Sequence, residues 1–250
     1  MSEMELTAEG ARRRLRLVRD YPADAADLWE AITDPARAVR WLAALERDGE
    51  AVTLGFDGGS RRTGTVEGCD SPRELRIVFD AATVEESHLI VTLEPRDAGT
   101  RLVLQQDGMP PLRAALITAG WQHHAERLAG QEPLTAMSEL LAAARVAEAR
   151  AVAGWIAVTD DEIIVELERA IAASPNRVRS ALPSELSALA ALSDHPAGTL
   201  VRLRETATGS GPEHAARRHA ALDVLQAELA GIPVPATDEL RQAAHAVYGG

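Results

Sequence analysis

The chain has 250 residues, 46% of them apolar, so it can bury the core of one large domain or two small ones. Its net charge is −12 at pH 7, which argues against nucleic acid and an anionic membrane as partners, because both favour basic surfaces. No apolar run has the length of a membrane span, the N-terminus lacks a secretory signal, and Cys69 is the single cysteine, so we expect a cytoplasmic protein.

Alternating apolar and polar residues predict a first strand at residues 14–21, and the run Arg12–Arg14 is interpreted as its solvent-facing entrance. Two short helices follow, with Asp24 capping the first and Asp34, which precedes Pro35, capping the second. Five more strand-like segments are separated by turn residues, and such short connections favour an antiparallel meander. The segments are residues 51–56, 61–68, 74–81, 87–95 and 100–107.

After Pro111 the apolar residues recur at helical spacing as far as Leu128, which predicts a long helix covering the apolar face of the sheet. The fold class is therefore α+β, with an antiparallel sheet curved around one helix. Most aromatic residues lie in the first half, so the better core or pocket belongs there. Because a small residue such as Gly120 leaves space beside the sheet, we expect an apolar cavity of several hundred Å³.

The second half repeats the first in a shortened form. Residues 165–192 align with 15–42 at a constant offset of 150, and GTLVRLRETATG at 198–209 resembles GTRLVLQQDG at 99–108. The shared order of strand, two capped helices, strand and proline-led helix favours a true repeat over chance recurrence. The second copy lacks the middle strands, so its small sheet needs additional strands, for instance from residues 155–158.

These patterns predict three segments. A first domain spans residues 1–130, and an alanine-rich helical linker containing Leu134, Met137 and Leu140 lies within 131–160. A truncated second copy follows at 161–250.

Four features occur together within residues 12–130: Trp29, the step Thr33-Asp34-Pro35, the pair Arg40-Trp41, and Trp121 in the long helix. With the meander, they resemble the START/Bet v1-like (SRPBCC) superfamily, and within it the branch of Hsp90-ATPase-activator homologues. The resemblance implies a helix-grip fold with an apolar cavity between sheet and long helix. The second half has no Thr-Asp-Pro step and no Arg-Trp pair, so the resemblance weakens there.

The resemblance also bears on function. Members of the superfamily bind lipids, hormones and polyketides, and some belong to actinobacterial polyketide or enediyne pathways as biosynthetic or antibiotic self-resistance proteins. Our leading hypothesis is a binder of an apolar, elongated small molecule such as a polyketide, a polyene or a lipid-like chain. One alternative is a polyketide cyclase or aromatase-like enzyme with His124 as acid or base. Another is a chaperone-linked protein-interaction module with a solid core and an exposed apolar patch.

The residues expected to bind the ligand face the predicted cavity. They are Trp41, Phe56, Phe79, Ile117, Gly120, Trp121 and His124. The aromatic members either stack on a flat ligand or fill the core. His124 shares the helix face of Trp121 and is the one weak catalytic candidate, whereas His123 points about 100° away.

No metal and no cofactor is expected. The histidines lack a third ligand at useful spacing, and the glycines of FDGGSRRTG precede a strand instead of the helix that a phosphate-binding loop requires. Cys69 lies beside Asp70, which disfavours a reactive thiolate. We find no nucleophile triad or carboxylate pair.

Overall fold

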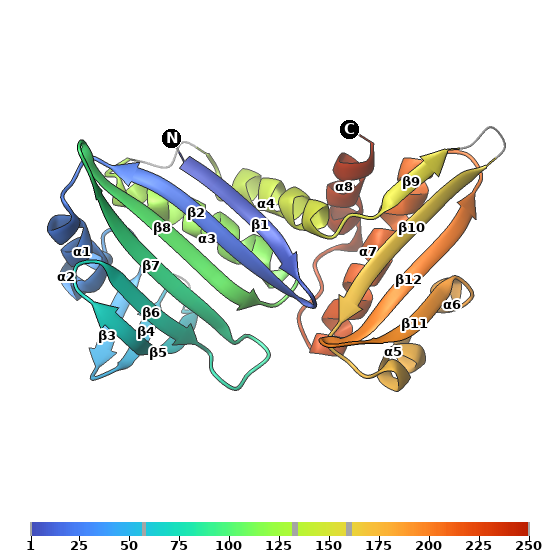
Figure 1. The fold of residues 1–250 in the computed structure, drawn as a ribbon, viewed down its shortest axis with the longest axis horizontal. Coiled ribbons are helices and arrows are strands. Elements are labelled where there is room, and N and C mark those ends of the chain that lie inside the picture. Colours follow the sequence, from blue (N-terminus) through green and yellow to red (C-terminus); the bar gives the residue numbers. More distant parts are fainter. Residues whose placement is uncertain (1, 57–58, 132–134, 159–161, 250) are drawn as a thin grey trace. The chain divides into compact units, whose positions relative to one another are not determined.

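The computed structural model describes residues 2–56, 59–131, 135–158 and 162–249. The chain divides into two compact units, and each contains its own antiparallel sheet and covering helices (Figure 1). The first unit comprises Met1–Leu6, Arg14–Pro110 and Leu116–Leu141; the second comprises Thr7–Arg13, Pro111–Ala115 and Ala142–Gly250.

The first sheet has eight strands in the order β1-β2-β8-β7-β6-β5-β4-β3. From β3 to β8, strands adjacent in sequence pair antiparallel, as the short turns between them predict. The second strand lies beside β8, which brings the start of the chain next to the end of the meander. The strands are β1 (Ser2–Glu9), β2 (Arg12–Tyr21), β3 (Ala44–Asp48), β4 (Ala51–Gly55), β5 (Arg61–Asp70), β6 (Glu74–Phe79), β7 (Ser87–Arg96) and β8 (Gly99–Met109).

Two of these strands, β1 and β3, are absent from the sequence prediction. Both are edge strands rich in charge. In β3 only Leu45 is partly buried, so that strand shows no clear alternation. In β1, Met4 and Leu6 alternate with glutamates, and the prediction missed this signal. The interpretation of Arg12–Arg14 as wholly solvent-facing is wrong for Arg13, which is 1% exposed. Side chains two residues apart in a strand point to the same face, so Arg13 points to the interior as Leu15 does.

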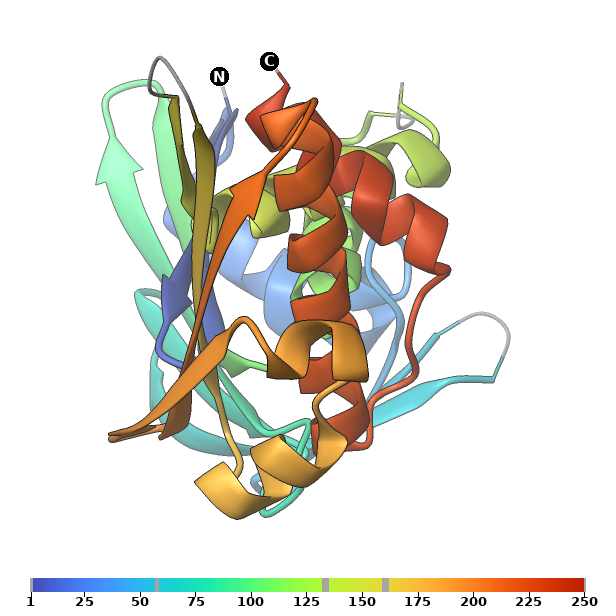
Figure 2. The ribbon, with the colours of Figure 1, turned by 90° about the vertical axis from the view of Figure 1, so that its right-hand side faces the viewer.

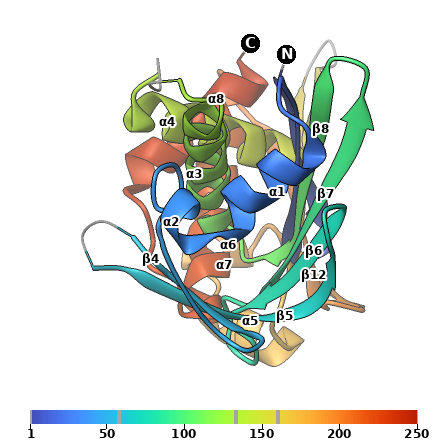
Figure 3. The same cartoon turned by 90° about the vertical axis from the view of Figure 1, so that its left-hand side faces the viewer.

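Three helices complete the first sheet's architecture: α1 (Ala25–Thr33), α2 (Pro35–Ala38) and α3 (Arg113–Leu128). The predicted caps form, because Asp24 accepts from the backbone N–H of Asp27 at 2.7 Å and Asp34 accepts from that of Ala36 at 2.8 Å. The strands β5 to β8 curve past α3, and the α1–α2 pair lies on the same side (Figure 3). The core between them contains Leu15, Leu17, Phe79 and Leu93, all nearly fully buried.

The second sheet has four strands in the order β11-β12-β10-β9. Helix α7 runs along one face of this sheet, and α8 packs against α7 (Figure 2). The elements are α4 (Met137–Ala151), β9 (Trp155–Val158), β10 (Ile163–Ile171), α5 (Pro175–Ala181), α6 (Ser184–Ser187), β11 (Ala190–His195), β12 (Gly198–Ala207), α7 (Gly211–Ala230) and α8 (Thr237–Tyr248). Their core includes Leu167, Val178, Val201 and Leu222.

A pair of backbone positions shows that the two units repeat one design. Gly99 and Gly198 open β8 and β12 with φ of 134° and 129°. A Cβ at Gly99 would lie 2.1 Å from the carbonyl oxygen of Tyr21, and one at Gly198 would lie 2.4 Å from that of Ile171. Tyr21 and Ile171 differ by the predicted offset of 150, so each glycine makes the same close approach to the end of the matching strand.

The next residue repeats as well. Thr100 Oγ1 donates to the carbonyl of Ala23 at 2.8 Å, and Thr199 Oγ1 donates to that of Ala173 at 2.6 Å. The two threonines close the corresponding turn in each unit. The order strand, two helices, strands and long helix is therefore duplicated, and the second copy lacks the middle strands.

The region between the copies contains a helix and the extra strand suggested for the second sheet. Helix α4 begins at Met137, and Leu134 lies outside the described residues. Residues 155–158 form β9, which pairs with β10 as the edge of the second sheet. The division at residues 130 and 160 stays a prediction. No helix in the described ranges combines the length and hydropathy needed to cross a membrane.

Candidate functional site

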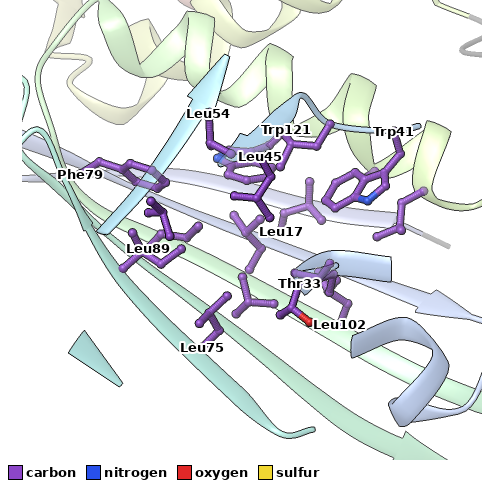
Figure 4. A pocket seen from close by; sticks show the side chains of 18 of the residues that line it. Leu17, Thr33, Trp41, Leu45, Leu54, Leu75, Phe79, Leu89, Leu102 and Trp121 are labelled. Atoms are coloured by element: carbon purple, nitrogen blue, oxygen red, sulfur yellow. The ribbon is translucent and has the colours of Figure 1, made fainter. Parts of the chain in front are cut away.

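An apolar cavity of about 70 Å³ lies within the first unit, between the curved sheet and α3 (Figure 4). Three turns of α3 contribute Trp121, Ala125 and Leu128, which share one face because they are four and then three residues apart. Apart from Thr33 and Arg47, the lining side chains are aliphatic or aromatic. The rest of the wall is Leu17, Tyr21, Ile32, Trp41, Leu42, Leu45, Val52, Leu54, Val66, Leu75, Ile77, Phe79, Leu89, Val91, Leu102 and Leu104.

The polar groups on this wall are bonded to the protein itself. Four of the side chains donate to backbone carbonyls: Tyr21 Oη to Ala125 (2.9 Å), Trp41 Nε1 to Ala31 (2.8 Å), Thr33 Oγ1 to Trp29 (2.8 Å) and Arg47 Nε to Gly49 (3.0 Å). The fifth, Trp121, donates from Nε1 to the side-chain oxygen Oε1 of Gln106 at 2.7 Å. Burial also raises the pKa of Tyr21, which keeps its hydroxyl neutral. The wall therefore offers a ligand hydrocarbon and aromatic contacts.

The cavity is smaller than the several hundred Å³ expected from the sequence. Drug-sized ligands occupy roughly 300–1,000 Å³, so an elongated guest requires the walls to move apart. Long leucine side chains such as Leu54, Leu75 and Leu102 fill much of the space in the observed state. Because they are held by packing without hydrogen bonds, rotamer changes can widen the cavity.

The decisive comparison concerns this same part of the chain. The family model described as activator of Hsp90 ATPase homolog 1-like protein matches residues 22–130, which carry α1 to α3 and the strands β3 to β8. The match covers 109 of the 250 residues, so the likeness to this family applies to this segment alone. The activator-homolog-like segment has the architecture that the resemblance implies, an antiparallel sheet curved past one long helix.

Solved structures resemble the chain over about half of its length. CalU16 from Micromonospora echinospora is 21% identical with a TM-score of 0.49, and the match covers 59% of this chain and 98% of that one. Protein MLL2253 from Mesorhizobium loti is 24% identical with a TM-score of 0.44, covering 47% and 95%. Protein CV1439 from Chromobacterium violaceum is 24% identical with a TM-score of 0.40, covering 48% and 97%. No curated protein matches the chain.

Within the activator-homolog-like segment, three of the seven expected ligand residues meet at the cavity: Trp41, Phe79 and Trp121. Figure 4 shows the two indoles across the cavity from Leu75 and Leu89. The other four, Phe56, Ile117, Gly120 and His124, are not part of the wall. The assignment of all seven as ligand-binding residues stays a prediction.

His124 is tied to the backbone beside the cavity. Its Nδ1 lies 2.9 Å from the carbonyl oxygen of Trp41, so Nδ1 carries the proton in this contact. Burial lowers the pKa of His124, and the carbonyl of Trp41 opposes this shift. Its ring lies 6.3 Å from that of Phe56 and 5.4 Å from that of His123, which is half-buried and does not point wholly outward as expected.

Sequence reasoning missed most of the aliphatic wall. Leu75 and Leu89 alternate in strands that were predicted, and their inward parity was available as a signal. Leu45 and Arg47 lie on β3, the strand that was not predicted, so no signal pointed to them. Ile32 comes from α1, whose burial depends on tertiary packing.

The second unit contains a buried polar cluster. Arg169 donates to both Asp223 and Gln226, and Gln226 Nε2 donates to the carbonyl of Ala170 at 2.9 Å. Arg169, which is 2% exposed, therefore pairs with an acid in the interior. Burial acts to raise the pKa of Asp223, but Arg169, His219 and Arg13 together outweigh it and hold that pKa below its usual value.

His219 and Tyr248 extend this cluster. His219 Nδ1 lies 3.0 Å from the hydroxyl of Tyr248, which accepts from the backbone N–H of Gly154 at 2.9 Å. His219 Nε2 lies 3.5 Å from Oδ2 of Asp223, one helical turn along α7. Burial lowers the pKa of His219 to about 4, so the ring is neutral near neutral pH.

Glu148 on α4 completes the buried charges of the second unit. Its carboxylate accepts from the backbone N–H groups of Leu112 at 2.6 Å and Ala115 at 3.3 Å, at the start of α3, and lies 3.5 Å from Arg13 Nε. Burial raises its pKa, against the effect of Arg13. Arg13 pairs with Glu148 and Arg169 pairs with Asp223, so we interpret the cluster as structural: it holds the elements of the second unit in one packing arrangement.

The residues in the described ranges form no group of three or more histidines, cysteines and carboxylates that suits a metal. Cys69 is exposed with a free thiol.

Proposed function

We propose that the first unit binds an apolar, elongated small molecule, such as a polyketide, a polyene or a lipid-like chain, in the cavity between its sheet and α3. The observation that carries the proposal is the character of the wall: a contiguous set of aliphatic and aromatic side chains whose polar atoms are bonded within the protein. Such a wall gains free energy by burying hydrocarbon, and its uncharged polar groups are already paired. Arg47 is the one charged side chain of the wall and is exposed to solvent. The resemblance to START/Bet v1-like proteins suggests a role in natural-product biosynthesis or self-resistance.

The two alternatives are less well supported, although the small cavity is close to the solid core expected of an interaction module. A cyclase needs an acid or base on the wall, whereas His124 lies off it and is bonded to the carbonyl of Trp41. An interaction module needs a contiguous apolar patch. Of the exposed large apolar side chains of the first unit, Val39 and Val84 lie in two different turns and Leu116 lies on α3.

Energy transfer from tryptophan to a neutral conjugated polyene tests the proposal. Parinaryl alcohol absorbs where tryptophan emits, and Trp41 and Trp121 both face the cavity. We expect saturable quenching of tryptophan emission with matching polyene emission. Replacing Trp121 by Phe should reduce the transfer more than replacing Trp29, which is not on the wall.

A cavity-filling variant locates the site. Ala125 lies on the wall, so Ala125→Leu should weaken binding by about tenfold or more, because the larger side chain occupies the space of the guest. Ala26 on α1 is exposed, and Ala26→Leu is the matched control with unchanged affinity. Non-saturable quenching, or equal affinity in the two variants, would refute the proposal.

A further inference from the structure

A second hollow adjoins the apolar cavity in the first unit. It measures about 380 Å³, and Trp41 and Leu128 line both spaces. Its three charged lining residues are all arginines: Arg37, Arg40 and Arg127. We call it the arginine pocket; its other lining residues are Ala31, Gly130 and Gln131. An all-cationic hollow beside a hydrocarbon cavity is notable in a chain of net charge −12.

The three arginines differ in their partners. Arg37 is neutralised, because its guanidinium lies 2.8 Å from Asp27 and 3.2 Å from Glu30. Arg127 donates to the backbone carbonyl of Arg40 at 2.9 Å, which orients the group but supplies no opposite charge. In the part of the chain that the structure describes, the Arg40 side chain has no hydrogen-bond or ion-pair partner. Two positive charges in the pocket thus lack a carboxylate.

The wall between the two spaces has one fixed side and one movable side. Trp41 is held by the hydrogen bond from its Nε1 to the carbonyl of Ala31. Leu128 is the last residue of α3, is partly exposed, and is held by packing alone. A rotation of Leu128 is therefore the simplest way to join the apolar cavity to the arginine pocket.

We propose that the ligand is an amphiphile with a carboxylate head, and that Arg40 and Arg127 bind this head while the hydrocarbon chain occupies the apolar cavity. This inference rests on the proposed function and adds the class of ligand. The planar guanidinium fork matches a carboxylate in geometry, and a charge-assisted pair gains strength beside an apolar wall. The neutralised Arg37 contributes less than the other two.

A matched pair of polyenes tests the head group separately from the chain. Parinaric acid and parinaryl alcohol have the same tetraene chain and differ in the head, and both are followed by energy transfer from tryptophan in the full chain. We expect wild-type protein to bind the acid about tenfold more tightly than the alcohol, and added salt to reduce that preference. The double variant Arg40→Gln/Arg127→Gln should bind the acid no better than the alcohol, with alcohol affinity unchanged.

Arg241→Gln on α8 is the control, because it removes one exposed positive charge far along the chain in the second unit and should leave both affinities unchanged. Equal binding of acid and alcohol by wild-type protein would overturn the head-group assignment and leave the proposed function standing. An acid preference that survives in the double variant would overturn the role of these two arginines. Binding of neither probe would overturn the head-group assignment and the proposed function together.

Discussion

The indole Nε1 of Trp121 donates to Oε1 of Gln106 at 2.7 Å and so fastens helix α3 to strand β8 beside the apolar cavity. Gln106 in turn donates from Nε2 to Oγ of Ser87 at 2.9 Å, and Ser87 also accepts from Arg62 at the same distance. Gln106 and Ser87 are fully buried. A polar chain in such surroundings stabilises the fold only while all its members are paired.

We expect Gln106→Leu to lower the free energy of unfolding by about 1–3 kcal/mol, because it leaves the Trp121 indole N–H buried without an acceptor. Urea unfolding followed by circular dichroism measures the change. Trp121→Phe removes the donor, so the double variant should cost less than the two single variants together. Strictly additive costs would show that the two side chains are not coupled.

Gly120 on α3 provides a second prediction, because a Cβ there would have no atom within 4 Å. Gly120→Ala should raise the free energy of unfolding by about 0.5–1 kcal/mol, since alanine loses less backbone entropy in a helix. Gly64→Ala is the contrast: its Cβ would lie 2.9 Å from both Ile77 and Phe79, so it should destabilise the protein. A loss of stability in Gly120→Ala would mean that the space beside it is occupied.

The two strand-opening glycines should be equally intolerant of substitution. Gly99→Ala and Gly198→Ala each place a methyl group against a carbonyl oxygen, and we expect each to cost about 3 kcal/mol or more. Gly49→Ala is the control, because Gly49 also has positive φ, at 59°, but open space around it, so about 1 kcal/mol is expected. Thermal unfolding of the three variants separates the cost of the clash with a carbonyl oxygen from the cost of a positive φ alone. Similar costs at all three positions would contradict the close approach.

His219 should make stability depend on pH. Its folded pKa of about 4 lies below the ordinary 6.5, mainly because of burial, although Asp223 opposes the shift. Between these values the unfolded chain binds a proton that the folded chain does not, so the free energy of unfolding falls as the pH is lowered through this window. The total for this group is about 3 kcal/mol.

Urea unfolding of wild-type protein and His219→Gln across this window measures that contribution. Glu148 has a raised pKa, so its contribution makes the free energy of unfolding fall as the pH rises above its ordinary value of 4.5. This contribution is present in both proteins. The difference between the two curves therefore isolates His219. We expect the wild-type curve to fall more steeply toward acid, and parallel curves would show that His219 is protonated in the folded state.

Much of the first unit was predictable, because its strands and caps depend on local patterns. The alternation in residues 87–95 and the cap at Asp34 both lie within one element, and both appear as expected. The edge strand β3 was not predictable, because its register comes from pairing with β4, and most of its side chains are exposed.

Three of the four aromatic residues expected at the cavity, Trp41, Phe79 and Trp121, line it, whereas Phe56 does not, and the small volume was not expected. Trp41 and Trp121 face the cavity as their positions indicated, but how tightly leucines such as Leu54 close it depends on packing across the sheet. The buried state of Arg13 illustrates a related limit. Its inward parity was visible, but the compensating charge, Glu148, lies far away in sequence.

The Gly-Thr pairs at residues 99–100 and 198–199 form the same main-chain crossing in both units. In each unit the glycine lies against a carbonyl oxygen at the end of the neighbouring strand, and the threonine hydroxyl donates to a second carbonyl two residues further on. The second unit lacks the middle strands, so this crossing does not depend on them. A shortened copy of the fold can therefore keep the connection between these two strands with only this local geometry in place.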